Sequence, residues 1–303
     1  MPDLKVTIAG VEFKNPIIVA SGFYGYGQEY QQFYPLDRLG GVTLNGTTLG
    51  AKEGSPTPRI SEAASGILSN TGMPNPGVQS LLNDALPKLS HSGTVLIANL
   101  AAGTALDFAK IAGAVSDSCV DMIEVNLAAA NMENGGNPFG AAVKSIESAV
   151  KNIRLTCKKK LIVKLPPNLT QIADLAKAAE GAGADALSLI GTVFGMRIDV
   201  KTRRPFLKTN VGGLSGPAIF PLALRMVWQA ANAVKIPVIG IGGVSRWQDA
   251  AEMLLAGAKA VEVGSALFSD PMAPVRIIDG LAAYLGDNNL NSVSQLSGKM
   301  ECW

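Results

Sequence analysis

The sequence has little of several residue types, and each shortage argues against a class of function. Its single histidine, His91, lies in the turn-like segment 90–93, so a Ser-His-Asp triad has almost no support. Its three cysteines, Cys119, Cys157 and Cys302, show no CxxC pair and no metal-ligand spacing. This pattern argues against an iron–sulfur cluster and against any metal site, and it favours a reducing, cytoplasmic setting.

Charge and long apolar runs are also scarce. Charged residues make up 17% of the chain and the net charge is +2, so nothing indicates nucleic acid or an acidic membrane surface as a partner. No run of eighteen apolar residues is present, which argues against a membrane span. The N-terminal residues carry charges and show no signal-peptide pattern.

Hydrophobic residues and glycine are abundant, at 48% and 33 residues of 303. Eight short apolar runs are typical of parallel strands buried on both faces; they cover 17–20, 41–44, 95–98, 122–125, 161–164, 186–190, 238–241 and 260–263. Helical patterns occupy 141–156, 171–181, 218–234 and 247–256, and a β-hairpin is expected at 5–13. The fold class predicted is α/β, a (βα)8 TIM barrel in one domain, 1–303.

Two segments are too long to be simple turns. They cover 46–76 and 191–213 and follow the second and sixth predicted strands. Both leave the C-terminal ends of strands, where barrel enzymes build their active sites. Long ordered insertions there are more often functional than idle.

Three glycine clusters lie in the last third of the chain, at 212–217, 240–243 and 263–266. The last two each follow an apolar strand pattern and precede a helical one. A glycine turn there exposes backbone N–H groups beside a helix N-terminus, which is a phosphate-binding geometry. A single GxGG is weak because glycine also ends helices. Two such turns on successive units predict a phosphate-bearing cofactor or substrate.

Polar residues end or closely follow most of the predicted strands; they are Ser21, Asn45, Asn99, Asn126, Lys164 and Thr192. A lone Asn or Ser in such a place ordinarily caps a helix. Lys164 is different because apolar residues flank it on both sides. A buried lysine needs an anionic partner or a task, such as stabilising negative charge on a reduced flavin.

Taken together, these motifs resemble the class 1 dihydroorotate dehydrogenases, which are FMN-dependent (βα)8 oxidoreductases of pyrimidine metabolism. The resemblance covers nearly the whole chain, and segments 196–199 and 224–227 are most similar to subclass 1B. The matching stretches are 20–27, 56–59, 72–77, 163–165, 199–205, 212–217, 240–244 and 263–266.

The resemblance implies an FMN site and a substrate site. The FMN contacts would be Ser21, Asn45, Gly46, Asn99, Asn126, Lys164, Ile190, Gly216, Gly242, Gly243, Gly264 and Ser265. The substrate contacts would be Ser69, Asn70, Thr71, Gly72, Met73, Asn126, Asn131, Gly191 and Thr192. A homodimer and an iron–sulfur flavoprotein that passes electrons to NAD are implied as well.

The chain departs from the family pattern where the substrate would react. The family's base is a cysteine in an Asn-x-Ser-Cys-Pro-Asn loop, and Ala129 occupies that position. Asn45 replaces a lysine that touches flavin and orotate, while Ser69 and Gly191 replace two asparagines. Loss of a positioned base typically costs about 10²–10⁴-fold in rate. Weak candidates for a replacement acid or base are Glu133, Thr71 and Ser69.

Three interpretations follow. The first is an FMN-dependent oxidoreductase that transfers a hydride between flavin and a CH–CH or C=C bond of a small, cyclic, pyrimidine-like substrate other than dihydroorotate. The second is a dihydroorotate dehydrogenase with a displaced base. The third is a non-catalytic flavin-binding subunit. The sequence leaves open the substrate, the direction of reaction and the electron acceptor or donor.

Overall fold

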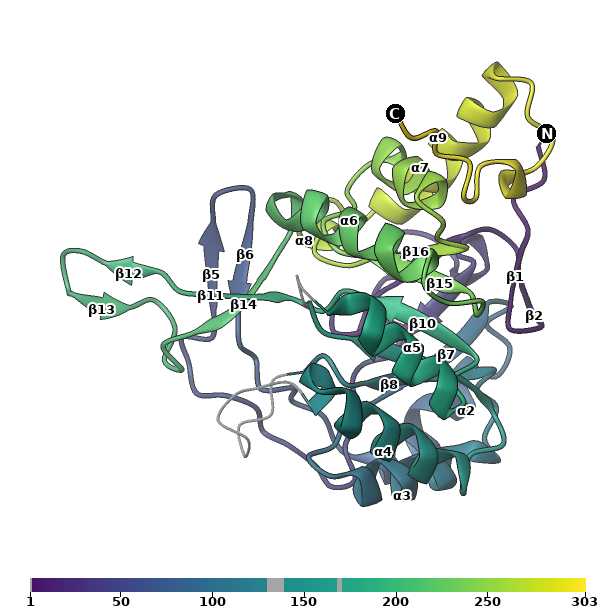
Figure 1. Cartoon of the computed structure of the whole chain (residues 1–303). Coiled ribbons are helices and arrows are strands. Elements are labelled where there is room, and N and C mark those ends of the chain that lie inside the picture. Colours follow the sequence, from purple (N-terminus) through teal and green to yellow (C-terminus); the bar gives the residue numbers. More distant parts are fainter. Residues whose placement is uncertain (1, 130–138, 168–170) are drawn as a thin grey trace.

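A closed barrel of eight parallel strands forms the centre of the computed structural model (Figure 1). The structure describes residues 2–129, 139–167 and 171–303. The barrel strands are β3 (Ile17–Val19), β4 (Gly41–Thr43), β7 (Val95–Leu100), β8 (Met122–Asn126), β9 (Lys160–Leu165), β10 (Ala186–Leu189), β15 (Val238–Ile241) and β16 (Ala260–Val263). Their order around the barrel is their order in the chain. The predicted TIM barrel is confirmed, and each predicted strand overlaps one of these.

Helices cover the outside of the barrel; the long ones are α3 (Ala105–Ser116), α4 (Val143–Arg154), α5 (Ile172–Ala182), α6 (Phe220–Ala231), α7 (Trp247–Leu255) and α9 (Ala273–Asp287). Shorter pieces are α1 (Val78–Ser80), a π-helical turn at Leu81–Ala85, α2 (Leu86–Leu89) and α8 (Ala266–Ser269). The four predicted helices correspond to α4–α7, whereas α3 and α9 are additional. Segment 20–40 holds only a 3₁₀ turn at Leu36–Arg38, and there Tyr24 stacks on Tyr30 with ring centroids 4.4 Å apart.

The predicted N-terminal hairpin closes one end of the barrel. It consists of β1 (Val6–Ile8) and β2 (Val11–Phe13), joined by Ala9 and Gly10, which both have positive φ as a tight hairpin turn requires. Ile8 and Phe13 are fully buried. They pack against inward-facing apolar residues near the N-terminal ends of the barrel strands. A ligand can therefore reach the barrel interior only from the opposite end, where the strands finish.

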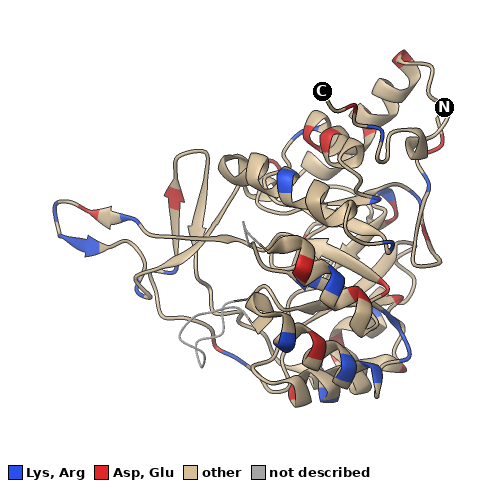
Figure 2. Ribbon diagram, in the orientation of Figure 1, with Lys and Arg blue, Asp and Glu red and all other residues tan. Residues whose placement is uncertain are grey.

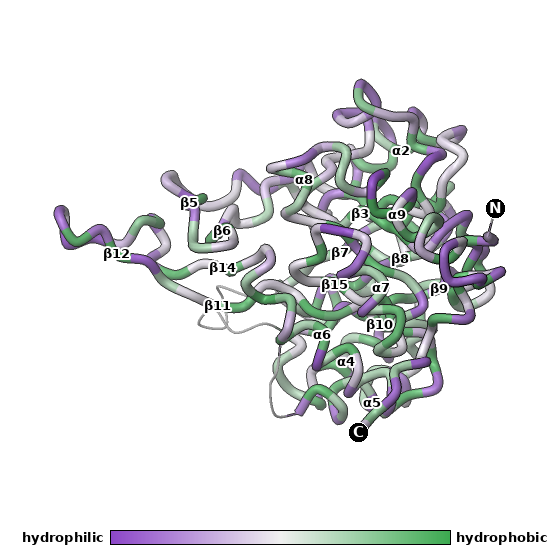
Figure 3. Tube along the Cα trace, turned by 90° about the horizontal axis from the view of Figure 1, so that it is seen from above, coloured by the Kyte–Doolittle hydropathy of each residue, from purple (hydrophilic) through white to green (hydrophobic). Residues whose placement is uncertain are grey.

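Strand alternation sorts side chains between two cores. On β8, Ile123 and Val125 belong to the core between barrel and helices, while Met122 belongs to the core inside the barrel. Because side chains alternate along a strand, Glu124 also faces inward. Figure 3 shows the apolar barrel centre and the more polar outer edge, and in Figure 2 charged residues are spread over the outer helices α3 and α4.

The two long insertions form one structure. Strands β5 (Ile60–Ala63) and β6 (Gly66–Ser69) come from the first, and β11 (Val193–Gly195) and β14 (Gly212–Ser215) from the second. They pair in the order β11-β14-β6-β5, and the small hairpin β12 (Ile198–Asp199) and β13 (Arg204–Pro205) extends beyond them. This arm projects from the barrel in Figure 1. The described helices include none long and apolar enough to cross a membrane.

The hairpin plug gives a stability prediction. Phe13→Ala removes a fully buried ring, and we expect the free energy of unfolding to fall by about 3–5 kcal/mol. Urea denaturation of the two proteins measures the difference. Phe33 is 47% exposed, so Phe33→Ala is the matched control, with an expected loss below about 1 kcal/mol. Equal losses in the two variants would contradict a structural role for the hairpin.

Candidate active site

A layer of buried polar side chains lies above the apolar plug, inside the barrel. Its centre is Lys164, whose Nζ lies 3.3 Å from Oε1 of Glu124 and 3.2 Å from Oε2 of Glu262. The lysine side chain is 7% exposed and both carboxylates are fully buried. The anionic partner that the sequence required for Lys164 is therefore present twice.

Neutral donors complete this layer. The Nδ2 group of Asn99 donates to Oε1 of Glu124 at 2.5 Å, and Oγ of Ser188 donates to Oε2 of the same carboxylate at 2.6 Å. Oγ1 of Thr43 donates to Oε1 of Glu262 at 3.3 Å. Glu124 thus accepts from three side chains, whereas Glu262 accepts from two at longer distances.

The charges of this layer do not balance when both carboxylates are ionised. Burial alone would lower the pKa of Lys164, but the attraction of Glu124 and Glu262 outweighs burial and the pKa lies above its ordinary value. Burial, with repulsion from Glu124, raises the pKa of Glu262 to about 8 although Lys164 opposes the shift. Lys164 therefore stays charged throughout the physiological range.

Sequence reasoning missed both glutamates. Each sits between two apolar residues, as Ile123-Glu124-Val125 and Val261-Glu262-Val263, at an inward position on its strand. A lone charged residue in an apolar run is the signal that could have found them. The contact of Glu262 with Lys164 depends on barrel closure, because β16 and β9 are not adjacent strands, whereas Glu124 lies on β8, which pairs with β9.

The glycine turns gather at the mouth of the barrel. Gly242 and Gly243 follow β15 with φ of +126° and +75°, which L side chains rarely adopt. A Cβ at Gly243 would lie 2.8 Å from the carbonyl oxygen of Gly216, so two of the three glycine clusters are in contact. A Cβ at Gly242 would be 3.4 Å from Ile190.

The third glycine cluster follows the neighbouring strand. Gly264 comes directly after β16, which pairs with β15, and a Cβ there would lie 3.0 Å from the ring of Phe23. Ser265 precedes α8 and makes no side-chain capping bond. Ser21 is half-buried and follows β3, the strand that pairs with β16. The expected phosphate-turn residues therefore share one rim.

The first insertion reaches into the mouth through Met73. A Cβ added at Gly46 would lie 2.7 Å from the sulfur of Met73 and 3.3 Å from Oδ1 of Asn99. Met73 has a φ of +55°, a left-handed conformation that is uncommon outside glycine. Asn45, half-buried, directly precedes Gly46. An apolar side chain therefore lies beside the position of the family's lysine.

The loop after β8 lies against the end of β10. A Cβ at Gly191 would come within 2.6 Å of Cβ of Ala128, so no larger residue fits at 191 without a shift. Oδ1 of Asn126 accepts from the amide of Ala128 at 3.2 Å and fixes the start of the loop. Ala129 is partly exposed next to this contact. Two departures from the family pattern thus lie in one apolar wall.

The other expected substrate residues belong to the arm. Asn70 uses its side chain there, accepting from Ser55 Oγ and donating to the carbonyl of Val211, both at 3.3 Å. Ser69 pairs with Gly213, against which Thr192 packs. The Thr71 carbonyl accepts from the amide of Ser55. A Cβ added at Gly72 would clash with the nitrogen of the same amide.

Several expected or excluded residues lie elsewhere. Asn131 and Glu133 fall outside the described residues. Cys119 and Cys157 precede β8 and β9, at the closed end, as their sequence positions predicted. Within the described ranges, no group of three His, Cys, Asp or Glu could hold a metal ion.

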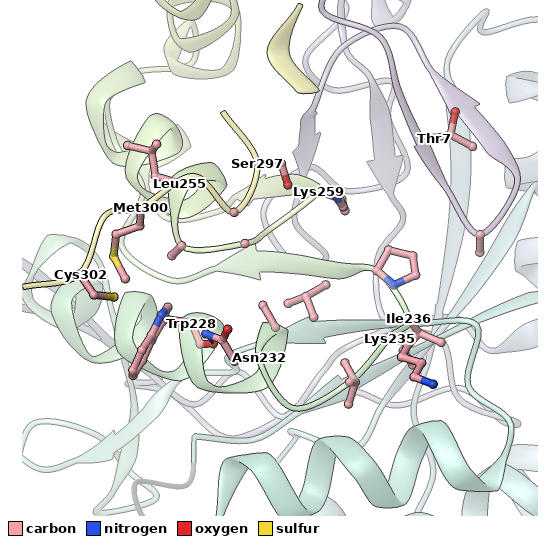
Figure 4. A pocket seen from close by; sticks show the side chains of 18 residues that line it. Thr7, Trp228, Asn232, Lys235, Ile236, Leu255, Lys259, Ser297, Met300 and Cys302 are labelled. Carbon is pink, nitrogen blue, oxygen red and sulfur yellow. Dashed lines mark hydrogen bonds between the residues drawn. The ribbon is translucent and has the colours of Figure 1, made fainter. Parts of the chain in front are cut away.

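A cavity of about 620 Å³ lies at the closed end of the barrel, away from these residues. It is bounded by Trp228 and Asn232 of α6, by Lys235 and Lys259, and by the C-terminal segment with Met300 (Figure 4). Both lysines are exposed. The cavity is separate from the polar layer and glycine turns, so its size does not make it the active site.

A (βα)8 barrel with glycine turns after its last two strands is typical of enzymes that bind a phosphate group at the ends of those strands. The model of the family Dihydroorotate dehydrogenase matches residues 3–285. The chain belongs to the dihydroorotate dehydrogenase family. It is accordingly an FMN-dependent oxidoreductase that acts on a CH–CH donor.

Curated relatives are similar over their full length. The catalytic subunit of dihydroorotate dehydrogenase B (NAD(+)) from Bacteroides fragilis is 44% identical, with 99% of this chain and 100% of the relative covered. The catalytic subunit of the same name from Geobacter sp. strain M21 is 44% identical, with 99% of each chain covered. A DHODH structure from Eimeria tenella, in complex with ferulenol, has a TM-score of 0.83 at 22% identity, covering 99% of this chain and 89% of that chain, which supports the fold.

The mouth of the barrel fits a flavin. Oδ1 of Asn99 is buried and has no hydrogen-bond partner among the described residues, while its Nδ2 is used by Glu124. A buried acceptor without a donor costs about 1–3 kcal/mol, and a ligand N–H or O–H would remove that cost. The glycine rim and the Lys164 ammonium supply the complementary donors that a phosphate and an electron-rich ring require.

The charged layer gives a second stability prediction. Lys164→Met leaves two buried carboxylates without a cation, and we expect a loss of about 3–5 kcal/mol in unfolding free energy at pH 8. The loss should be smaller at pH 5, where protons can replace the ammonium. Urea denaturation at both pH values measures it, with the exposed Lys177→Met on α5 as the control. A pH-independent loss would contradict the ion-pair interpretation.

Proposed function

We propose that this chain is one (βα)8 domain that transfers a hydride between FMN and a CH–CH or C=C bond of a small cyclic, pyrimidine-like substrate other than dihydroorotate. The observation that carries this proposal is a barrel mouth that keeps the features suited to FMN but offers an anionic substrate neither a free cation nor a base at position 129. Each half of that statement rests on named residues.

The cofactor half rests on the rim and the polar layer. Gly242, Gly243, Gly264 and Ser265 would hold the phosphate, with Ser21 and Gly216 beside them. Asn45, Gly46, Asn99, Asn126, Lys164 and Ile190 would surround the ring and the chain that joins it to the phosphate. Bound FMN supplies hydride transfer. Lys164 would hold a positive charge against the ring, and the hairpin plug excludes water from below.

The substrate half rests on charge. Lys164 is the only buried Lys or Arg among the described residues, and it already faces two carboxylates. Dihydroorotate carries a carboxylate of its own, which would enter a site whose one buried cation is already paired with two carboxylates. An unpaired buried charge costs several kcal/mol. A neutral ring with the same amide groups avoids that cost.

The chemistry of the wall points the same way. Ala128, Ala129 and Gly191 stand where the resemblance places polar or thiol side chains, and Met73, which belongs to a stretch that matches the family, lies against Gly46. None of these four can move a proton. The base that takes the carbon-bound proton, or the acid that returns it, would come from Ser69, Thr71 or Glu133.

Dihydroorotate itself is the second candidate, favoured by the name of relatives at 44% identity. A base displaced to another loop residue would then replace the thiol. Orotate titrated into the flavin spectrum decides this point: a spectral change at micromolar orotate would support it, and none at millimolar orotate would end it. The relatives' designation as a catalytic subunit also leads us to propose an electron-transfer partner. The homodimer of this chain that the family resemblance implies is proposed as well.

Anaerobic mixing tests the proposed substrate class. We expect a neutral dihydropyrimidine such as dihydrouracil to bleach the flavin absorbance at least about 10²-fold faster than dihydroorotate does, because an unpaired buried carboxylate costs several kcal/mol and about 1.4 kcal/mol corresponds to tenfold. The double variant Asn45→Lys/Ala129→Cys should gain rate with dihydroorotate, because it restores a cation and a thiol. Faster bleaching of the unaltered protein by dihydroorotate than by any neutral ring would sink the proposal.

A glycine substitution tests the FMN site separately. Gly243→Ala forces a Cβ to within 2.8 Å of the Gly216 carbonyl at a φ of +75°. We expect FMN affinity to fall about tenfold or more, since about 1.4 kcal/mol corresponds to tenfold. Quenching of FMN fluorescence measures the dissociation constant. Gly286→Ala is the control, because a Cβ there meets nothing within 4 Å; equal affinities in both variants would remove Gly243 from the site.

A further inference from the structure

The two carboxylates that hold Lys164 are not equivalent. Glu124 accepts from Lys164, Asn99 and Ser188, two of these bonds being 2.6 Å or shorter. Glu262 accepts from Lys164 at 3.2 Å and from Thr43 at 3.3 Å. Because hydrogen bonds to a carboxylate stabilise its charged form, the fewer and longer bonds leave Glu262 the less stabilised of the two carboxylates.

The remaining surroundings of Glu262 are apolar. Its register neighbours are Ile241 on β15 and Ile18 on β3. Across the barrel it faces Thr43, Glu124 and Lys164, and no other titratable or charged group from the described barrel strands points into this layer. With one ammonium and two carboxylates in a dry interior, a proton on Glu262 makes the layer neutral.

We propose that Glu262 is a positioning residue that acts on the flavin through Lys164, because it competes with the cofactor for the lysine's positive charge. When Glu262 is ionised, the layer beneath the ring carries one net negative charge. When Glu262 is protonated, Glu124 alone balances Lys164 and the layer is neutral. The inference rests on FMN occupying the proposed mouth, and it requires no particular substrate.

The consequence is a reduction potential that depends on this carboxylate. A nearby negative charge disfavours electrons on the flavin, so ionised Glu262 lowers the potential. By linkage, electrons on the flavin make the carboxylate hold its proton more tightly. The pKa of Glu262, raised to about 8, places the change inside the range in which the holoenzyme can be measured.

The experiment compares the holoenzyme with Glu262→Gln, which keeps the shape of the side chain and removes its charge. The midpoint potential of the bound flavin is measured against reference dyes from pH 6 to pH 10. We expect equal potentials at pH 6, a steeper fall of the unaltered protein above about pH 8, and a higher potential for Glu262→Gln at pH 9. Indistinguishable curves would overturn the proposal.

Glu252→Gln is the matched control, because Glu252 is exposed on α7, the helix that precedes β16, and its curve should follow that of the unaltered protein. Where Glu262→Gln retains no FMN, the unaltered protein alone decides: a curve without a steeper segment contradicts the proposal. No substrate enters either measurement, so a wrong substrate class cannot affect the result.

The FMN-free protein provides an independent readout. Glu262 has a folded pKa above its ordinary 4.5, so its contribution to stability is present below that value and is lost as pH rises toward about 8. We therefore expect the melting temperature of the unaltered protein to fall relative to Glu262→Gln between pH 5 and pH 9. A constant difference across this range would show that Glu262 is ionised throughout it in the folded protein, and the proposal would fail.

Discussion

The ammonium of Lys164, held between two carboxylates in a dry barrel, is the interaction on which the site depends. It joins β9 to β8 and to β16 on the opposite part of the barrel, with Nζ–O distances of 3.3 and 3.2 Å. A buried ion cluster of this kind adds little net stability compared with apolar packing, but removing one member is costly. Its presence therefore argues for a role beyond stability, namely fixed charge beneath the barrel mouth where we propose that FMN binds.

Two kinds of wall meet above this charge. One is the glycine rim, where Gly216, Gly242 and Gly243 allow backbones to approach closely and leave room for a phosphate group. The other is the apolar wall of Ala128, Ala129 and Gly191. The first is compatible with the family's cofactor, and the second differs from the family's substrate side. A barrel permits such independent change because cofactor and substrate contacts come from different strand ends.

Much of the fold could be predicted from the sequence, because buried parallel strands are continuous apolar runs and turns after them are marked by glycine. Lys164 was likewise predictable as a buried cation. Glu124 and Glu262 were not assigned: Glu124 stands inside an apolar run on the neighbouring strand β8, and the pairing of Glu262 with Lys164 depends on barrel closure. The sequence also did not predict the arm. Segments 46–76 and 191–213 pair through Ser69 and Gly213, and no local sequence pattern identifies a pairing partner so distant in the chain. Asn70 was expected from the family resemblance to bind substrate, and in the structure its side chain bonds to Ser55 and Val211 within the arm.

The hairpin at the N-terminus has a consequence for the order of events during turnover. Ile8 and Phe13 fill one end of the barrel. Among the described residues, this leaves the opposite end of the barrel as the route to the proposed flavin site. A reductant and an oxidant that must both touch the ring can then do so only in turn, each departing before the other arrives. An electron acceptor that reacts while the reductant is still bound cannot contact the ring. It must instead bind on the outer surface near the rim and receive its electrons through the intervening protein.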